Sequence, residues 1–231
     1  MPPKILIGCP TAEEKAYCLD EYIQGLRDLT WKNAEFIIVD NSPTQEYAER
    51  MRAKGLRVIN DVRLDDVKER IAHSRNMIRD LLLKGDYDYF LSLEQDVIPP
   101  PDLIERMLSA QVSVITGVYF TAYKIDNQIK MRPLVWKAHS DSAQMTFMNE
   151  EVRAAKGKIK NVVPVRASGL GVMLIHRNVL EKIPFRAVPE SFDDMPFCQD
   201  LAKAGIQLYA DLTIVCKHLV KFEGQVLVLP P

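Results

Sequence analysis

The residue types and spacing of two carboxylates, which lie two residues apart, make them candidates for a chemical role. Glu94 and Asp96 follow an apolar segment, residues 89–93, and precede three consecutive prolines at 99–101. Side chains alternate along a strand, so a strand over 89–96 directs Glu94 and Asp96 to the same face. Prolines cannot extend the hydrogen-bond ladder, which places the pair at the strand's carboxyl end. The pair predicts a divalent metal with a phosphate, although a solvated acidic strand end explains it equally well.

Strands and helices alternate around this acidic pair. Apolar runs predict strands at 4–9, 35–39, 56–59 and 112–120, and helical spacing predicts helices at 13–29, 44–54, 65–84 and 102–110. This alternation predicts one α/β domain with a Rossmann-like, mainly parallel mixed sheet flanked by helices. Because open sheets of this kind bind ligands at the carboxyl ends of their strands, residues 1–120 are expected to bind a nucleotide.

The second half of the chain, 121–231, has less regular signals. Residues 123–131 are polar and predict a loop, and 150–160 are charged with little apolar face. These features predict an irregular region over a site, or else an ordinary surface excursion. Further strands are expected at 134–138, 144–148, 162–165, 172–175 and 207–219, with helices at 177–182 and 192–205. The apolar tail at 225–229 predicts either an edge strand or a contact within a homodimer.

The composition limits the classes of protein that remain. The chain has 231 residues, 30 of them basic and 31 acidic, so no nucleic-acid footprint and no polybasic membrane patch is predicted. Its apolar runs are shorter than the ~20 residues of a membrane span, and its first residues lack a signal-peptide core. Four scattered cysteines without a C-x-x-C pair predict buried thiols in a reducing compartment. We therefore expect a soluble cytoplasmic protein.

Glycine-rich phosphate loops are missing from the expected positions. No G-x-G-x-x-G follows the first strand and no Walker lysine motif occurs, which argues against a Rossmann dehydrogenase and a P-loop enzyme. Gly169 and Gly171 precede a strand rather than a helix, so they lack the geometry that places a pyrophosphate on a helix amino terminus. Residues 9–12 also lack the basic, glycine-rich loop of sugar-phosphate nucleotidyltransferases. Recognition of a nucleoside diphosphate through a metal remains.

From residue 5 to residue 218, the order and spacing of short motifs resemble a glycosyltransferase of the GT-A fold, similar to family 2. Residues 94–96 occupy the place of the D-x-D motif, which bridges a metal to the diphosphate of the donor. The resemblance implies that Asp96 is the principal ligand of Mn²⁺ or Mg²⁺. It implies His218 as a second ligand and Glu94 as a residue acting through water.

The same resemblance implies a pocket for a nucleotide-sugar donor such as a UDP- or GDP-sugar. The second strand ends at Asp40, where the family's Asp meets the base, and residues 73–76 resemble the A-R-N segment whose Arg lies against the nucleotide. The residues expected at the nucleotide are Pro10, Thr11, Asp40, Arg75 and Gln95. Ser168 and Gly169, in a glycine turn over 167–171, are expected at the donor sugar.

Residues 192–198 resemble the E-D-x-x-F motif, which supplies the general base of an inverting transfer to an unknown acceptor hydroxyl. The base is Asp193 or Asp194, and Asp194 is expected to have a pKa lowered by the amino terminus of its helix. Helix capping alone also explains an acidic pair there. A retaining transferase on the same fold, and a non-catalytic protein that binds a nucleotide-sugar or glycan, stay as alternatives. Residues after about 120 are expected to bind the acceptor.

Overall fold

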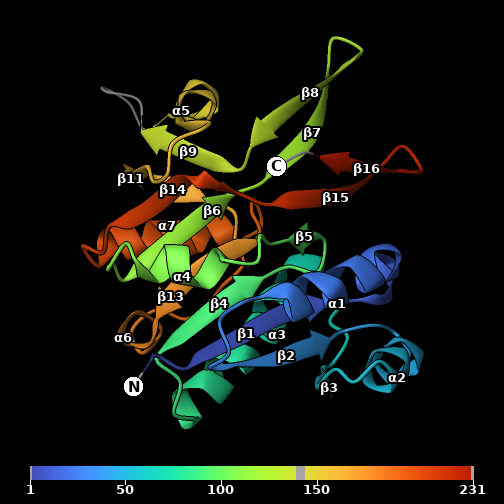
Figure 1. The fold of residues 1–231 in the computed structure, drawn as a ribbon. Helices are drawn as coiled ribbons and strands as arrows, with labels where there is room; N and C mark the ends of the chain where they lie inside the picture. Colours follow the sequence, from blue (N-terminus) through green and yellow to red (C-terminus); the bar gives the residue numbers. More distant parts are fainter. Residues whose placement is uncertain (1, 139–143, 230–231) are drawn as a thin grey trace.

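An eight-stranded mixed sheet forms the centre of the protein in this computed structural model, which describes residues 2–138 and 144–229. The strand order is β11-β14-β6-β13-β4-β1-β2-β3 (Figure 1). The bounds are β1 Ile5–Thr11, β2 Ala34–Asp40, β3 Val58–Asn60, β4 Tyr89–Leu93, β6 Val114–Val118, β11 Val162–Val165, β13 Val172–His176 and β14 Leu208–Val215. Strands β3, β2, β1 and β4 are parallel, β14 is parallel to β6, and β13 is antiparallel to β4 and β6. The predicted mainly parallel mixed sheet is confirmed.

Helices cover both faces of this sheet (Figure 1). One hydrophobic core lies under α1 (Leu19–Asp28), α2 (Glu46–Ala53) and α4 (Leu103–Leu108), and the other under α3 (Val67–Lys84), α6 (Arg177–Leu180) and α7 (Asp194–Lys203). Alternation along β1 divides its side chains between the two cores, with Ile5 and Ile7 in the first and Leu6 in the second. The 3₁₀ helix η1 (Glu13–Cys18) precedes α1 and completes the turn after β1.

Three smaller sheets lie beyond the central one. They are β9 (Val135–Ala138) with β10 (Met145–Phe147) and β12 (Ala167–Ser168), β5 (Val97–Ile98) with β15 (Lys217–Phe222) and β16 (Gln225–Leu229), and the hairpin β7 (Phe120–Ile125) with β8 (Gln128–Pro133). Helix α5 (Asn149–Ala155) follows β10. The segment 225–229 is an edge strand against β15. Of the region expected to be irregular, residues 139–143 lie outside the described residues.

The predicted loop over 123–131 is wrong, because these residues belong to the β7–β8 hairpin. Its two turn residues, Asp126 and Asn127, have φ angles of 53° and 58°. Asp and Asn tolerate this left-handed conformation, and two consecutive positive φ angles match the right-handed twist of a hairpin. These two turn residues therefore favour a hairpin, although the strands on either side of them are polar.

The expectation that the four cysteines are buried thiols is confirmed. Cys9, Cys18, Cys198 and Cys216 are buried free thiols. Within residues 2–138 and 144–229, no helix is long and apolar enough to cross a bilayer.

Candidate functional site

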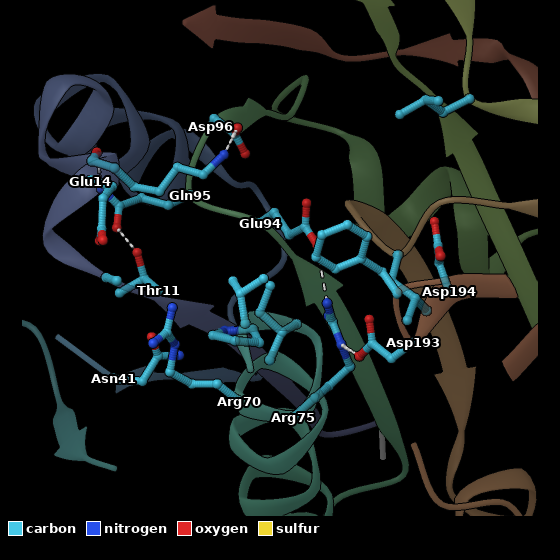
Figure 2. A pocket seen from close by; sticks show the side chains of 18 of the residues that line it. Thr11, Glu14, Asn41, Arg70, Arg75, Glu94, Gln95, Asp96, Asp193 and Asp194 are labelled. Atoms are coloured by element: carbon cyan, nitrogen blue, oxygen red, sulfur yellow. Dashed lines mark hydrogen bonds and ion pairs between the residues drawn. The ribbon is translucent and has the colours of Figure 1, made fainter. Parts of the chain in front are cut away.

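A cavity of about 460 Å³ opens at the carboxyl ends of β1 and β4 (Figure 2). It brings together segments distant in sequence, including η1, the amino-terminal half of α3 and the start of α7. Nine of the residues expected from the sequence line it: Pro10, Thr11, Arg75, Glu94, Gln95, Asp96, Asp193, Asp194 and His218. Residues that the sequence reasoning did not select also line it, and they include Lys15, Asn41, Arg70 and Tyr119.

The chain turns immediately after β4, which separates the two acids of the 94–96 motif. Strand β4 ends at Leu93, and the amide of Val97 donates to the carbonyl of Glu94 at 2.9 Å, which closes a tight turn. Glu94 contacts Arg75 (Figure 2), whereas Asp96 contacts Lys15 and His218. The expected strand over 89–96 is therefore too long, because it ends at Leu93, although both Glu94 and Asp96 line the cavity.

Asp96 stands in a corner with two basic groups. Its side chain is 4% exposed, and its Oδ2 atom lies 3.2 Å from His218 Nε2 and also accepts from the ammonium of Lys15. Its Oδ1 atom is buried and has no hydrogen-bond partner among the described residues. His218 Nδ1 lies 2.6 Å from the carbonyl of Phe120, which requires a proton on Nδ1. Nε2, which is directed at Asp96, therefore carries a lone pair in the neutral ring or a second proton in the charged ring.

The charges in this corner shift each other's pKa. Burial alone raises the pKa of Asp96, but the hydrogen bond from His218 and the charge of Lys15 outweigh it and lower that pKa. Burial alone lowers the pKa of His218 and of Lys15, but Asp96 outweighs it and raises both. Asp96 is therefore an ionised carboxylate at neutral pH, with a cationic neighbourhood that compensates its burial.

Asp96 and His218 fit two positions in the coordination sphere of one divalent cation. Carboxylate and imidazole suit Mn²⁺, and the 3.2 Å between their ligating atoms matches neighbouring ligands at bonds of about 2.1 Å. The unpartnered Oδ1 of Asp96 and the Nδ1–H of His218 bonded to a carbonyl are also typical of metal-ligating groups. Among the described residues, no cluster of three or more His, Cys, Asp or Glu side chains is placed to hold a metal. A cation held by these two side chains would need further ligands, such as water oxygens.

Arg75 organises the opposite wall of the cavity. Its guanidinium is 1% exposed and bonds Asp193 Oδ2 at 2.7 Å and Glu94 Oε1 at 3.0 Å. Arg75 comes from α3, Glu94 follows β4 and Asp193 precedes α7, so this one side chain ties three elements together. Asp193 is the N-cap residue of α7, but its side chain makes no capping hydrogen bond. Its carboxylate forms an ion pair with Arg75 instead.

Asp194 has a different environment from its neighbour. One oxygen accepts from the amide of Met195 at 2.8 Å, and the side chain faces the cavity (Figure 2). Burial raises the pKa of Asp194 to about 6, and the charges of Asp193 and Glu94 add to this shift. The expected lowering by the helix amino terminus is wrong, because a single amide bond does not offset burial beside two other carboxylates.

Gln95 fixes the floor of the cavity. Its amide donates to the carbonyl of Lys15 at 2.7 Å and to the hydroxyl of Tyr47 at 2.6 Å. Its oxygen accepts from Thr11 Oγ1 at 2.6 Å (Figure 2). Gln95 is 1% exposed, so its polar atoms are used within the protein and it holds Thr11 and η1 in place.

Asp40 does not line the cavity, whereas the next residue does. Asp40 is 1% exposed, its Oδ1 accepts from the hydroxyl of Ser42 at 2.6 Å, and its Oδ2 is buried without a partner. Burial raises the pKa of Asp40, which the bonds from Ser42 partly offset. Asn41 lines the cavity, its amide donating to Ser74 at 3.0 Å, and Arg70 lies close to it (Figure 2).

Arg70 is a candidate binding residue that sequence reasoning missed. It is 8% exposed and donates through one nitrogen to the carbonyl of Leu64 at 2.9 Å, and its buried Nε has no partner within the part of the chain that the structure describes. Its position one helical turn before Ser74, within the same helix as Arg75, is the signal that could have selected it. Lys15 could have been selected because it follows the carboxyl end of β1.

Ser168 and Gly169 do not line the cavity. The hydroxyl of Ser168 is fully buried and donates to the carbonyl of Leu134 at 3.0 Å. A Cβ atom at Gly169 would lie 2.1 Å from the hydroxyl of Tyr119, and that hydroxyl also accepts from the amide of Gly171 at 3.0 Å. The glycine turn therefore makes room for Tyr119, which does line the cavity and packs edge-on against His218. The placement gives no support to a sugar contact by Ser168 or Gly169.

Sequence comparisons and structural comparisons give different results for this chain. No protein-family model and no curated protein matches its sequence. Its fold matches solved structures. A197 from STIV is 16% identical with a TM-score of 0.51, the match covering 99% of this chain and 95% of that one.

Two further structures match over a part of a longer chain. GalNAc-T7, solved with UDP, GalNAc and Mn²⁺, is 11% identical with a TM-score of 0.70, the match covering 96% of this chain and 45% of that one. The mannosyltransferase PcManGT from Pyrobaculum calidifontis, solved with GDP-Man and Mn²⁺, is 15% identical with a TM-score of 0.63, the match covering 96% and 59%. The chain therefore spans about half the length of these two proteins. Together the matches show that its fold is GT-A-like.

Proposed function

We propose that this protein is a metal-dependent glycosyltransferase, which moves a sugar from a UDP- or GDP-sugar to the hydroxyl of an acceptor and inverts the anomeric carbon. The observation that carries the proposal is the cavity itself. A corner suited to a divalent cation, Asp96 with His218, and a carboxylate with a raised pKa, Asp194, face the same space. Solved neighbours of the same fold hold UDP with Mn²⁺ and GDP-Man with Mn²⁺, which supports the donor class.

In this proposal Asp96 and His218 hold Mn²⁺ or Mg²⁺. A cation held there would offset the negative charge that develops on the diphosphate leaving group. The protein's part is to present Asp96 already ionised and His218 with its proton on Nδ1, as the Phe120 carbonyl requires. Glu94 forms an ion pair with Arg75, so we propose that it helps to hold Arg75 in place at the wall of the cavity.

The nucleoside is proposed to bind at the ends of β1 and β2. Pro10, Thr11 and Asn41 line this side, and the buried donors of Arg70 face it. Arg70 supplies N–H groups for a base carbonyl, a ribose oxygen or a phosphate. Asp40 is placed directly behind Asn41, with one acceptor oxygen still unpartnered.

Asp194 is proposed as the general base, with Asp193 as its positioning neighbour. The bond between the anomeric carbon and the diphosphate oxygen breaks while the acceptor oxygen bonds to that carbon from the other side. The acceptor hydroxyl transfers its proton to Asp194. A pKa of about 6 suits this step, because the carboxylate is mostly ionised at neutral pH yet is a stronger base than an ordinary Asp. Asp193 is bound to Arg75, so its carboxylate is not available for the proton.

The test is release of nucleoside diphosphate from UDP- and GDP-sugars, measured with and without Mn²⁺ and with candidate acceptor glycans. A transferase releases UDP or GDP in a Mn²⁺-dependent reaction and forms a glycoside of opposite anomeric configuration. Binding of donor without any release would instead favour a non-catalytic nucleotide-sugar-binding protein. Retention of configuration in the product would reject Asp194 as the base of an inverting reaction.

A further inference from the structure

The ammonium of Lys15 occupies the place at Asp96 that a metal ion needs. Lys15 and His218 both contact the same oxygen, Oδ2 of Asp96. A divalent cation shared by Asp96 Oδ2 and His218 Nε2 would lie against that ammonium. Like charges at such a distance repel strongly in a partly buried site, so the ion and the ammonium exclude one another.

Lys15 is built so that its side chain can leave while its backbone stays. Its carbonyl accepts the 2.7 Å hydrogen bond from the Gln95 amide, which fixes the main chain of η1. Its side chain is 42% exposed, whereas the Asp96 side chain is 4% exposed. A lysine ammonium on a flexible four-carbon stem can therefore swing away from a carboxylate that cannot move.

The cavity offers the displaced ammonium a second partner once a donor is bound. A diphosphate coordinated beside Asp96 would carry its negative charge next to η1, within reach of the same stem. We infer that Lys15 is an exchangeable cation, which neutralises Asp96 before the metal arrives and pairs with the donor diphosphate afterwards. This inference rests on the proposed function, because it takes a nucleoside diphosphate as the ligand.

The exchange makes the binding affinity for the metal depend on the nucleotide, and the affinity for the nucleotide depend on the metal. Metal alone has to displace Lys15 and leave it without a partner, so its affinity is low. Metal and diphosphate together satisfy every charge, so each strengthens the binding of the other by the same factor. Lys15 thereby keeps the site from holding a metal when no donor is present.

The experiment compares the wild type with Lys15→Met and Lys15→Arg. Free Mn²⁺ is measured by electron paramagnetic resonance without nucleotide, and UDP and GDP affinities are measured by calorimetry with and without saturating Mn²⁺. In Lys15→Met we expect Mn²⁺ alone to bind about tenfold more tightly, since a competing charge pair is removed. The gain in nucleotide affinity produced by Mn²⁺ should shrink by a similar factor. Lys15→Arg keeps the charge and should keep the low affinity for Mn²⁺ alone.

Lys54→Met is the matched control. Lys54 is 41% exposed and pairs with Asp20 at 2.7 Å, but the Asp20 side chain is 78% exposed and outside the cavity. Lys54→Met should leave the affinities for Mn²⁺ and for nucleotide unchanged. If Lys15→Met binds Mn²⁺ alone as weakly as the wild type, the exchange is overturned while the proposed function stands. If the wild type binds neither UDP nor GDP in the presence of Mn²⁺, the proposed function and the exchange both fail.

Discussion

Two corners of the cavity balance buried carboxylates in different ways. In the first, Arg75 bonds Asp193 and Glu94, and its side chain is 1% exposed. In the second, Lys15 bonds Asp96 with a side chain that is 42% exposed. The guanidinium is enclosed and bonds two carboxylates and the hydroxyl of Ser92, whereas the ammonium pairs with Asp96 alone among the described residues and borders the cavity. The difference separates a corner that maintains the shape of the site, at Arg75, from the Asp96 corner, for which we proposed an exchange of partners.

The largest effect is expected from Asp194, which stands beside the fixed corner without belonging to its ion pairs. Asp194→Asn keeps the shape of the side chain but cannot accept a proton. We expect turnover to fall by ~10²–10⁴-fold, the usual contribution of a positioned base, with donor affinity little changed. Steady-state kinetics measure both quantities. Asp200→Asn, on the same helix but outside the cavity, is the control, and near-normal turnover in Asp194→Asn would refute the assignment.

Removing Arg75 should cost the most stability. Arg75→Met leaves the buried carboxylate of Asp193 without its cation, and breaking a buried pair from one side costs about 3–5 kcal/mol. Guanidinium denaturation measures the loss. The matched control is Arg186→Met, whose pair with Asp200 is 39% and 21% exposed and should be worth no more than about 1 kcal/mol. Equal losses in the two variants would remove the distinction between a fixed structural corner and an ordinary ion pair.

Asp40 tests whether the nucleoside reaches the buried end of β2. Its Oδ2 is an acceptor without a partner among the described residues. If a ligand N–H donates to it, Asp40→Ala should weaken the free energy of binding by about 1–3 kcal/mol. We expect UDP or GDP affinity to fall by a factor of about 5–150 in calorimetry, with the fold unchanged by circular dichroism. Unchanged affinity would exclude Asp40 from nucleotide binding.

The raised pKa of Asp194 predicts how the reaction depends on pH. The base must be ionised, so the rate should rise with pH through about 6 and be about tenfold lower at pH 5 than at pH 7. The folded-state pKa lies above the ordinary value, so Asp194 lowers stability as pH rises from about 4 to 6. Asp194→Asn should therefore be more stable than the wild type at pH 8, and not at pH 3.5. Thermal unfolding at both pH values measures this, and equal stability at pH 8 would contradict the shift.

The sequence predicted the sheet and the residues at its strand ends, because apolar runs and strand ends are local features. It could not predict the turn that follows Leu93, because the contacts of Gln95 with η1 and of Asp96 with β15 join segments distant in sequence. The β7–β8 hairpin was missed although its Asp126-Asn127 turn was readable. The raised pKa of Asp194 depends first on burial and then on the charges of Asp193 and Glu94, and both the burial and the approach of Glu94 are produced by the fold. Pairings such as Lys15 with Asp96 join residues 81 positions apart, which no local pattern reveals.

The central claim is that the Asp96 corner joins a metal to a nucleoside diphosphate. Calorimetric titration of UDP and GDP into the wild type and Asp96→Ala, each with and without Mn²⁺, tests it most directly. We predict that Mn²⁺ strengthens binding of one of these nucleotides to the wild type and that this gain disappears in Asp96→Ala. A Mn²⁺-dependent gain of the same size in Asp96→Ala would contradict the account.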